Sequence, residues 1–400
     1  MGIKHISHIN KKLIERIFTS ASIRRWNDKA VPLDFVELDK QAHKVILAYI
    51  FAKYEEHNNR KINYTKLIQQ FLFEFFERVV LTDIKPPVFH KLKKAHGKEL
   101  AEFVVKQLKQ ELEGFSFFKL MGDYLTEKND DIETKILHAA HFYASKWEFD
   151  IIYNFNPKLY DIENIKSIID SQTESFYDLI GMRNLYLYQD MRELMGMFAE
   201  LRFQKRWSQT PRIPQTSVLG HMLMVAIFAY LLSIDLNVCE KMQINHFFGG
   251  LFHDLPEVLT RDIISPIKRS VKGLDSFIKS IEKEEMDVKI LSKMPHFIRY
   301  DLEYWTEDEF KNRYKKDNEV IFSNSIDELI LHYNHDKYMP VCGELLKFCD
   351  KLTAFLEARI SISHGVSSPD LVNGSESIYD ELHKKEICYM NVGYILQEFM

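Results

Sequence analysis

Four residues in the second half of the chain have side chains that bind transition metals: His221, the adjacent pair His253-Asp254, and Asp350. Each lies on or beside an apolar stretch, where an unpaired charge is expensive to bury. Imidazole and carboxylate groups together suit a divalent ion such as manganese, cobalt, iron or zinc. Four protein ligands would leave coordination positions open for water and a substrate. We therefore predict that these residues hold one divalent metal ion.

Taken singly, each of these residues has an ordinary structural explanation. A lone histidine on an apolar helix, such as His221, is most often a core residue, and Asp350 could be a helix cap or an ion-pair partner. A His-Asp dipeptide also occurs at His335-Asp336, without the same flanking pattern, and we predict that this pair lies on the surface. The metal prediction therefore depends on the order and spacing of the four residues together.

Three long apolar segments must position these side chains. Residues 216–234 are apolar almost all round after a Thr-Ser pair, which predicts a buried helix with an N-terminal cap. Residues 238–254 predict a second helix, which ends at Leu255-Pro256 because proline cannot continue it. Residues 341–360 predict a third. The His-Asp pair thus stands at a helix end, where both side chains can reach one ion although helical neighbours point about 100° apart.

The bulk composition indicates a helical, globular protein. The 400-residue chain is 46% hydrophobic with 14 glycines and 11 prolines, and alternating runs of β-branched residues are nearly absent, so we predict an all-α fold. Residues 279–293 and 325–338 predict exposed amphipathic helices. The net charge of −5 argues against a general nucleic-acid binder or an anionic-membrane binder.

Cysteine usage and the N-terminal sequence bear on the compartment. The four cysteines are scattered and form no CxxC pair, which excludes a finger-type zinc site and suits a reducing environment; they are Cys239, Cys342, Cys349 and Cys388. Residues 1–12 lack the apolar segment of a signal peptide, and we expect no apolar run of membrane-spanning length. These features predict a soluble cytoplasmic protein that does not bind membranes.

The same series of local patterns occurs twice. The first series is RRWNDKAVP, QAHKVILAYIFA, FLFEFFERVVLTDIKPPV and ILHAAHFYASKWE, and the second is KRWSQTPRIP, GHMLMVAIFAYLL, GLFHDLPEVLTRDIISPIK and LLKFCDKLTAFLE. Four matching blocks in one order predict two tandem domains, residues 1–185 and 186–400. Each domain is expected to begin with its own helix, at HINKKLIERIF and at QDMRELMGMFAELRF.

The second series resembles the HD-domain superfamily of metal-dependent phosphohydrolases, and most closely its 5′-deoxynucleotidase branch. That branch has an Arg-Trp pair before the first ligand histidine, then HDxxEvlxxDxxxPvK, then a helix with aDxlxa. Here the pair is Arg206-Trp207, and His221 follows Trp207 by fourteen residues. The resemblance covers residues 190–360. Applied to both series, it implies two tandem HD-domain-like helical bundles, and for the second it implies one divalent metal and hydrolysis of a nucleoside 5′-phosphate.

The second motif supplies candidate catalytic residues. Glu257 lies one helical turn after Asp254 and could orient a metal-bound water or exchange protons with it. Asp262 is a second candidate, either for the leaving 5′-oxygen or for supporting the ligands. The division of these roles between the two carboxylates stays open. Lys268 also falls on the motif and is expected to contact the substrate.

The Arg-Trp pair supplies candidate substrate contacts. Arg206 offers a planar fork for a phosphate group. Trp207 offers a flat apolar wall, which in the resembling enzymes lies against the sugar and disfavours a 2′-hydroxyl. The plain alternative is a surface charge beside a core aromatic ring. We expect a 5′-nucleotidase that favours deoxyribonucleoside 5′-monophosphates, with the nucleotide as its small-molecule partner.

Two departures from the family pattern leave other functions open. Leu219-Gly220 stand where the family often has Ser-Glu, and residues 269–340 are longer and more charged than a minimal domain needs, which suits a lid or a partner surface. Hydrolysis of cyclic nucleotides, triphosphates or alarmones would require extra cations, which are available at Arg202, Lys205, Arg212, Arg261, Lys268 and Arg269. A non-catalytic nucleotide sensor or scaffold is the remaining alternative, and a homodimer is compatible with each function.

The first series keeps only part of the ligand set. His43 matches the first ligand, but Phe73-Glu74 replace the His-Asp pair and His141 replaces the final Asp. Loss of one ligand to phenylalanine should weaken metal binding sharply. We therefore predict a degenerate copy with a structural or regulatory role, the alternative being a remodelled metal site of His43, Glu74 and His141. Other positions that match the second series are Glu77, Asp83, Arg25 and Trp26.

Overall fold

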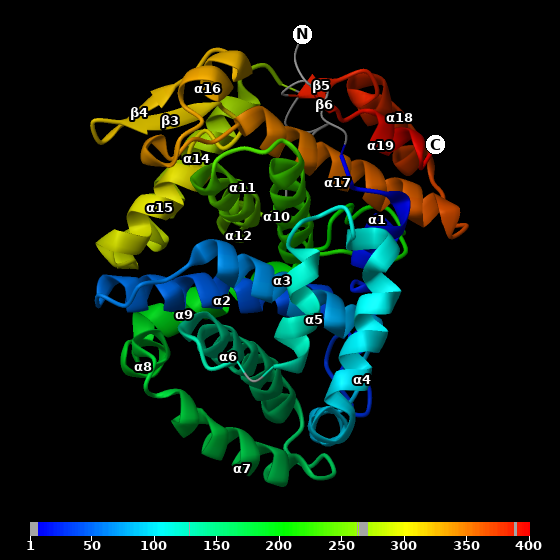
Figure 1. The fold of residues 1–400 in the computed structure, drawn as a ribbon, viewed down its shortest axis with the longest axis vertical. Helices are drawn as coiled ribbons and strands as arrows, with labels where there is room; N and C mark the ends of the chain where they lie inside the picture. The colour runs from blue at the N-terminus through cyan, green and yellow to red at the C-terminus, as the bar shows by residue number, and fades with distance from the viewer. Residues whose placement is uncertain (1–6, 128, 262, 264–270, 388–389) are drawn as a thin grey trace. The chain divides into compact units, whose positions relative to one another are not determined.

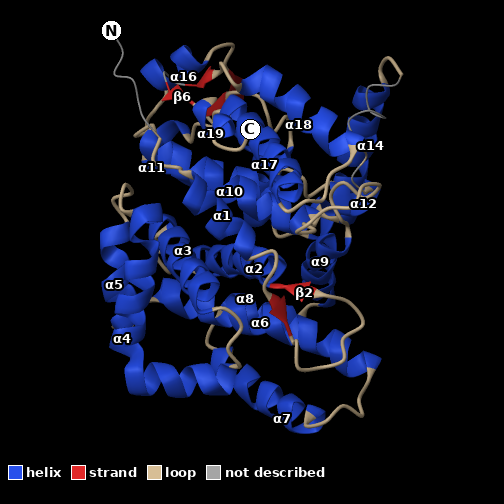
Figure 2. Ribbon diagram, turned by 90° about the vertical axis from the view of Figure 1, so that its right-hand side faces the viewer, coloured by secondary structure: helices blue, strands red, loops and turns tan. Residues whose placement is uncertain are grey.

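The structure is a computed structural model that describes residues 7–127, 129–261, 263, 271–387 and 390–400. Helices dominate these residues, and the described strands are two to four residues long and form three two-stranded antiparallel pairs (Figure 2). The predicted all-α fold is therefore confirmed.

Contacts within the chain divide it into two compact units. We call the first the C-terminal unit, which consists of Met1–Phe18, Leu201–Ser292 and Arg299–Met400. We call the second the N-terminal unit, which consists of Thr19–Glu200 and Lys293–Ile298.

The bounds of these units differ from residues 1–185 and 186–400 because the two predicted opening helices pack elsewhere. Helix α1 (Lys11–Thr19) buries its apolar face in the C-terminal unit, where His8 Nδ1 also lies 2.7 Å from Asp235 Oδ1. Helix α9 (Gln189–Glu200) belongs to the N-terminal unit. An amphipathic pattern shows that one face of a helix must be covered, but not which neighbour covers it.

The remaining elements of the C-terminal unit are mostly helices. They are α10 (Val218–Asp235), α11 (Glu240–Phe252), α12 (Glu257–Thr260), α14 (Leu274–Lys289), α15 (His296–Thr306), α16 (Ile326–His332), α17 (Gly343–Ser363), α18 (Pro369–Leu382) and α19 (Tyr394–Gln397), with strands β3 (Arg313–Lys316), β4 (Glu319–Phe322), β5 (Glu386–Ile387) and β6 (Met390–Asn391). The first three residues of α15 fall in the N-terminal unit.

The remaining elements of the N-terminal unit are also mostly helices. They are β1 (Arg24–Arg25), β2 (Phe35–Val36), α2 (Glu37–His57), α3 (Tyr64–Leu81), α4 (Pro86–Leu112), α5 (Phe118–Thr126), α6 (Ile132–Phe155), α7 (Ile162–Thr173) and α8 (Ile180–Leu187). Helix α6 packs against both α2 and α3 (Figure 1).

Helix α10 is the core of the C-terminal unit. Its N-terminal cap is Ser217, whose Oγ accepts a hydrogen bond from the Gly220 amide at 2.9 Å, as predicted. Contrary to the expectation of no such run, α10 is long and apolar enough to cross a membrane, the one helix of this kind among the described residues, with a hydropathy of 1.9 over 18 residues. Since 89% of that window is buried within the protein, α10 also has the burial of an ordinary core helix.

The segment between α15 and α17 contains structure that the sequence did not predict. The hairpin β3–β4 pairs Arg313 with Phe322 and Lys316 with Glu319, and the Arg313 amide also bonds to the Val341 carbonyl just before α17. This backbone pairing fixes the entry of α17.

The predicted helix 325–338 is shorter in the structure because its C-terminal residues cap another helix. After α16 the chain leaves helical geometry, and the side chains of Asn334 and Asp336 accept hydrogen bonds from the amides of Cys239 and Lys241 at 2.7 and 2.9 Å. Amides at a helix start have no partner within the helix, so these contacts stabilise the beginning of α11. His335 and Asp336 are exposed, as predicted.

Candidate active site

Three helices of the C-terminal unit, α10, α11 and α17, pack against one another (Figure 1). They bring the predicted ligands together. The close approach of α11 to α10 requires glycine at position 250, because a Cβ atom there would lie 2.9 Å from the backbone of Ala226. His221 is in the first turn of α10, His253 and Asp254 directly follow α11, and Asp350 is on α17.

The four side chains form one compact cluster. Each offers one ligand atom, and these atoms all lie within 4.8 Å of one another. His221 Nε2 is 3.0 Å from Asp350 Oδ1 and 3.9 Å from Asp254 Oδ2. His253 Nε2 is 3.2 Å from the same Asp254 oxygen. In the described part of the chain, no other group of three or more His, Cys, Asp or Glu side chains has this arrangement.

A hydrogen bond orients the His253 ring, and a contact with Glu357 lies beside the His221 ring, so that Nε2 of each imidazole faces the cluster. His253 Nδ1 lies 2.8 Å from the Gly250 carbonyl oxygen. This nitrogen must therefore carry the proton and donate it to the carbonyl, which leaves Nε2 with a lone pair when the ring is neutral. His221 Nδ1 lies 3.5 Å from Glu357 Oε1. Partners of this kind on the outer ring nitrogen are typical of metal-binding histidines.

Burial and neighbouring charges shift the pKa values of these groups in opposite directions. Burial lowers the pKa of the His253 imidazole, but Asp254 and Asp350 outweigh it and raise this pKa to about 9. Burial raises the pKa of the Asp254 carboxyl, but His253 and Arg206 hold this pKa well below its usual range. The Asp350 pKa is also lowered in spite of burial, through its hydrogen bond with His221. The two carboxylates therefore stay ionised and favour a cation between them.

The donor set fits a divalent metal ion. His253 Nε2 is buried and has no hydrogen-bond partner among the described residues, an arrangement that is costly unless a ligand is bound. Two imidazole nitrogens and two carboxylate oxygens are ligands that manganese, iron, cobalt and zinc accept. The imidazoles are fully buried, whereas the Asp254 and Asp350 side chains are 20% and 24% exposed. Water and substrate can therefore reach the site from the carboxylate side.

The segment before α10 holds Arg206 and Trp207 at this site. The Arg206 amide donates to the Thr216 carbonyl at 3.0 Å, and the Val218 amide donates to the Gln204 carbonyl at 2.9 Å. Trp207 has a φ of 55°, a left-handed conformation that a bulky residue rarely adopts. Arg206 acts electrostatically on Asp254 and lies 3.9 Å from Glu357. Both predicted substrate residues therefore belong to the surroundings of the ligand cluster.

Sequence reasoning missed Glu357, which connects the ligands with the Arg-Trp pair. This fully buried residue lies on α17, two helical turns after Asp350. Its carboxylate accepts hydrogen bonds from Trp207 Nε1 at 3.1 Å and from Thr216 Oγ1 at 2.6 Å. Burial raises its pKa, but Arg212 and His221 more than reverse this and hold the pKa well below its usual range. The sequence signal was a glutamate seven residues after Asp350, and therefore on the same face of the predicted helix as this ligand.

Of the two predicted catalytic carboxylates, the structure describes Glu257 but not Asp262. Glu257 is buried in the first turn of α12, and its amide donates to the Asp254 carbonyl at 3.1 Å. It thus directly follows the ligands in the chain. Asp262 and Lys268 lie outside the described residues.

Some of the basic residues that could bind more highly charged substrates are buried and have structural contacts. Arg202 is buried, and Arg212 is buried with hydrogen bonds to the Pro214 carbonyl and to Thr216 Oγ1. Arg212 therefore supports the segment before α10. Arg261 is exposed at the end of α12, and Arg269 lies outside the described residues.

The N-terminal unit contains a similar Arg-Trp-Glu arrangement. Trp26 has a φ of 56°, and its Nε1 donates to Glu148 Oε2 at 2.9 Å. Arg25 also donates to Glu148 at 2.9 Å and to Glu37 at 2.8 Å. Glu148 follows His141 by the same interval that separates Glu357 from Asp350. The corresponding contacts of Trp207 are thus repeated at the matching positions.

In contrast, the N-terminal unit has buried lysines where the C-terminal unit has its ligand cluster. The Lys44 ammonium donates to Glu74, which also accepts from Tyr124 Oη at 2.6 Å. Lys40 Nζ lies 2.5 Å from His141 Nδ1, and both lysines are fully buried. His43, Glu74 and His141 do not form a metal-ligand group in the described residues. The structure therefore does not favour the alternative of a remodelled metal site.

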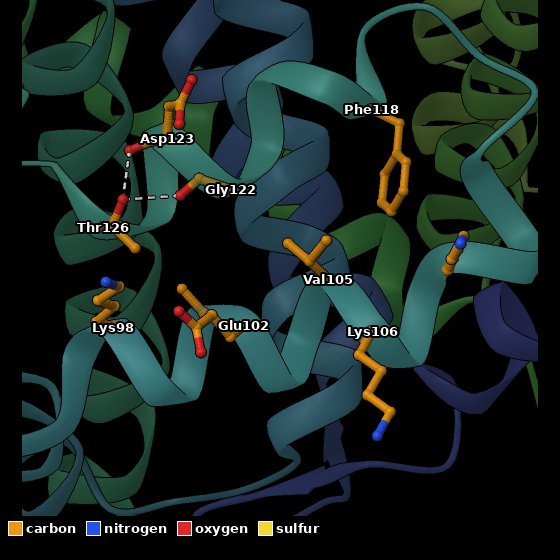
Figure 3. Close-up of a pocket in the computed structure, with 10 residues that line it drawn as sticks. Lys98, Glu102, Val105, Lys106, Phe118, Gly122, Asp123 and Thr126 are labelled. Atoms are coloured by element: carbon orange, nitrogen blue, oxygen red, sulfur yellow. Dashed lines mark hydrogen bonds between the residues drawn. The ribbon is translucent and has the colours of Figure 1, made fainter.

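The cavity shown in Figure 3 lies apart from these residues, between α4 and α5 of the N-terminal unit. It has a volume of about 580 Å³, and its lining includes Lys98, Val105 and Phe118. None of the predicted site residues lines it. We assign it no role in the chemistry of the ligand cluster.

The chain was compared with protein-family models, curated proteins and solved structures. Residues 198–379 match the family model of the HD domain, and this range contains all four candidate ligands as well as Arg206, Trp207 and Glu357. Comparison with curated proteins and with solved structures found no significant match. The family model and the His-Asp ligand geometry together support the assignment of residues 198–379 to the HD-domain superfamily, whose members are generally metal-dependent phosphohydrolases.

Proposed function

We propose that the C-terminal unit is a metal-dependent phosphohydrolase that releases phosphate from nucleoside 5′-monophosphates and prefers deoxyribonucleotides. The observation that carries this proposal is the ligand cluster of two buried imidazoles and two partly exposed carboxylates, with Arg206 and Trp207 beside it. We further propose that the protein acts in the cytoplasm on a small-molecule nucleotide, a setting with which a homodimer is compatible.

The residues around the cluster divide the chemistry as follows. A bound divalent ion would supply Lewis acidity toward the phosphoryl group and a lowered pKa for water. His221, His253, Asp254 and Asp350 would hold that ion. Arg206 offers a planar donor set to the phosphate oxygens. Glu257, buried directly after the ligands in the chain, would hold or accept the proton of the attacking water.

A panel of phosphomonoesters tests this proposal. Inorganic phosphate should be released from deoxyribonucleoside monophosphates in the presence of manganese, cobalt, iron or zinc, and release should stop when a chelator removes the metal. Ribonucleoside monophosphates, cyclic nucleotides, triphosphates and alarmones belong in the same panel. Reaction of only the last three classes would contradict the proposed substrate while leaving the metal-dependent chemistry in place.

Removal of the Trp207 ring is expected to reduce selectivity for the sugar. An indole packed against deoxyribose leaves a 2′-hydroxyl either without room or without a partner, a penalty that permits roughly 10- to 1000-fold discrimination in kcat/KM. Trp207→Ala should therefore bring AMP closer to dAMP, chiefly by accelerating AMP. Arg206→Ala should slow both substrates alike because both carry the same phosphate.

A second variant tests the position of the ring without removing it. A Cβ atom at Gly374, on α18, would lie 2.8 Å from Cη2 of Trp207, so Gly374→Ala should displace the indole. The ratio of kcat/KM for dAMP and AMP should then fall as it does for Trp207→Ala. If both variants keep the kcat/KM ratio of the unmodified protein, Trp207 does not discriminate between deoxyribose and ribose.

We propose that the N-terminal unit is a degenerate, metal-free copy of the same domain. The repeated Trp–Glu contact supports common ancestry of the units, and the Lys44–Glu74 pair supports the absence of a metal. The ammonium group of Lys44 supplies the positive charge that Glu74 requires. Phe73, which matches His253 in the sequence, packs against Phe117 and Tyr124. This unit would therefore have a structural or regulatory role and no hydrolytic activity.

Removal of the Lys44 charge should destabilise this unit. Lys44→Met leaves the Glu74 carboxylate without its ammonium partner, which is expected to cost about 3–5 kcal/mol. Hydrogen exchange in α2 and α3 measures the effect within this unit, and the double variant Lys44→Met/Glu74→Gln should recover much of the protection. In the unmodified protein a chelator should not change exchange in α2 or α3. A clear loss of protection on chelation would instead place a metal here.

A further inference from the structure

We propose that Glu357 is a positioning residue that couples the metal ligand His221 to the substrate residue Trp207. The proposal deepens the proposed function, since it concerns the same site. In this proposal, the Glu357 carboxylate sets the orientation of an imidazole in the ligand cluster. It also sets the orientation of the indole that contacts the sugar. Loss of this carboxylate should therefore weaken metal binding and sugar selectivity together.

One carboxylate oxygen of Glu357 contacts the metal ligand His221, and the other contacts Trp207. Oε1 lies 3.5 Å from His221 Nδ1 and accepts from Thr216 Oγ1 at 2.6 Å. Oε2 accepts from Trp207 Nε1 at 3.1 Å and lies 3.9 Å from Arg206 Nε. His221 Nε2, on the opposite edge of the ring, points to Asp350 at 3.0 Å. The carboxylate thus connects the ligand cluster with the Arg-Trp pair through direct contacts.

Burial makes this connection rigid. Glu357 has no exposed surface, so its charge must be compensated within the protein. Arg206 and the nearby Arg212 provide positive charge, and Arg212 also donates to Thr216 Oγ1 at 2.5 Å. Thr216 in turn lies next to Ser217, the cap of α10. The carboxylate is therefore fixed relative to the start of the helix that carries His221.

The N-terminal unit shows that the Trp–Glu contact does not depend on a metal cluster. Trp26 donates to Glu148 at 2.9 Å with nearly the same φ as Trp207, although buried lysines contact His141 and Glu74 in this unit. Glu148 accepts from Arg25 as well. The glutamate therefore contacts the Arg-Trp pair in a unit without the ligand cluster, and in the C-terminal unit it contacts a metal ligand in addition.

The test compares Glu357→Gln with Glu148→Gln, the matched change in the N-terminal unit. Glutamine keeps the size of the side chain but loses the charge. Apoprotein is titrated with zinc or manganese against a chromophoric chelator, so metal affinity is read without hydrolysis. For Glu357→Gln we expect metal affinity to fall about 10- to 100-fold and the dAMP-to-AMP ratio of kcat/KM to fall as well. Glu148→Gln should change neither quantity.

Two further variants keep the test decisive if Glu357→Gln folds poorly. Trp207→Phe retains an aromatic ring but removes the N–H donor, so its selectivity should fall if the contact with Glu357 orients the ring. Glu357→Asp keeps the charge and should retain more metal affinity than Glu357→Gln.

Metal affinity within about twofold of the unmodified protein in a folded Glu357→Gln variant would overturn the proposal, since outer partners of ligand histidines normally matter 10-fold or more. Full selectivity in Trp207→Phe would overturn the coupling to the ring. Because metal affinity is measured on its own, a wild-type protein that does not cleave nucleotides would contradict the proposed function and leave the ligand part of this test intact.

Discussion

Replacement of His253 by alanine is expected to remove the metal from the C-terminal unit and to lower kcat on the order of 10³-fold or more. The imidazole is fully buried, and its Nε2 atom has no hydrogen-bond partner among the described residues, so no neighbouring group can take over its ligand position. A bound ion contributes several kcal/mol to stabilising transition-state charge, and each 1.36 kcal/mol corresponds to about tenfold in rate. Metal content and single-turnover phosphate release measure the effect.

The matched control is His43→Ala, which removes a buried imidazole from α2 of the N-terminal unit. This variant should keep its metal and its kcat, because Lys44 already supplies the local positive charge beside Glu74. Equal loss of metal in the two variants would contradict the assignment of the metal to the C-terminal unit. Retention of full metal content in His253→Ala would remove His253 from the ligand set.

Replacement of Glu257 by alanine is expected to slow hydrolysis without releasing the metal. The residue is buried at the start of α12, directly after the ligands, and general acid–base groups contribute about 10²- to 10⁴-fold to turnover. We therefore expect kcat to fall on the order of 10²-fold or more while metal affinity stays within a few-fold. Turnover and chelator competition on the same preparations distinguish the two quantities.

Glu77→Ala provides the comparison for Glu257. Glu77 occupies the matching sequence position in the N-terminal unit, is buried, and pairs with Lys93 at 2.8 Å. Its removal should leave turnover unchanged. If Glu257→Ala loses the metal, Glu257 belongs among the ligands. If the variant retains both metal and turnover, Glu257 has no catalytic role, and Asp262 becomes the remaining candidate.

Helical periodicity and residue spacing predicted the elements that carry the ligand cluster. The apolar run at 216–234 corresponds to α10, and α11 ends at Phe252, two residues before the predicted end at 254. Because His253 and Asp254 follow that end, their side chains can converge although they are neighbours in sequence. A long, fully buried helix and a helix end are decided locally, and for this reason the sequence was sufficient.

Features that depend on contacts distant in sequence could not be predicted in this way. Lys40 and Lys44 look like residues of a solvated helix face, yet both are fully buried because Glu74 and His141 come from other helices. Glu357 is similar, since its partners Trp207 and Thr216 precede it by more than a hundred residues. A buried charge requires a partner, but the tertiary fold decides which charged residues are buried and which partners they have.

The left-handed conformation of Trp207 could not be predicted from the sequence either. Tryptophan does not favour this conformation, and its φ of 55° accompanies contacts with two helices distant in sequence, through Glu357 on α17 and the close approach of Gly374 on α18. Such strain is held only when surrounding structure determines it. It is therefore consistent with a substrate-contact role that spacing alone could only suggest.

The metal content of the purified protein, measured together with its activity, tests the central claim most directly. Elemental analysis should find about one divalent transition metal per chain. Dialysis against a chelator should remove the metal and the phosphate release from deoxyribonucleoside monophosphates in parallel, and return of the metal should restore both. A preparation from which all metal has been removed, but which hydrolyses its substrate at the original rate, would contradict the account.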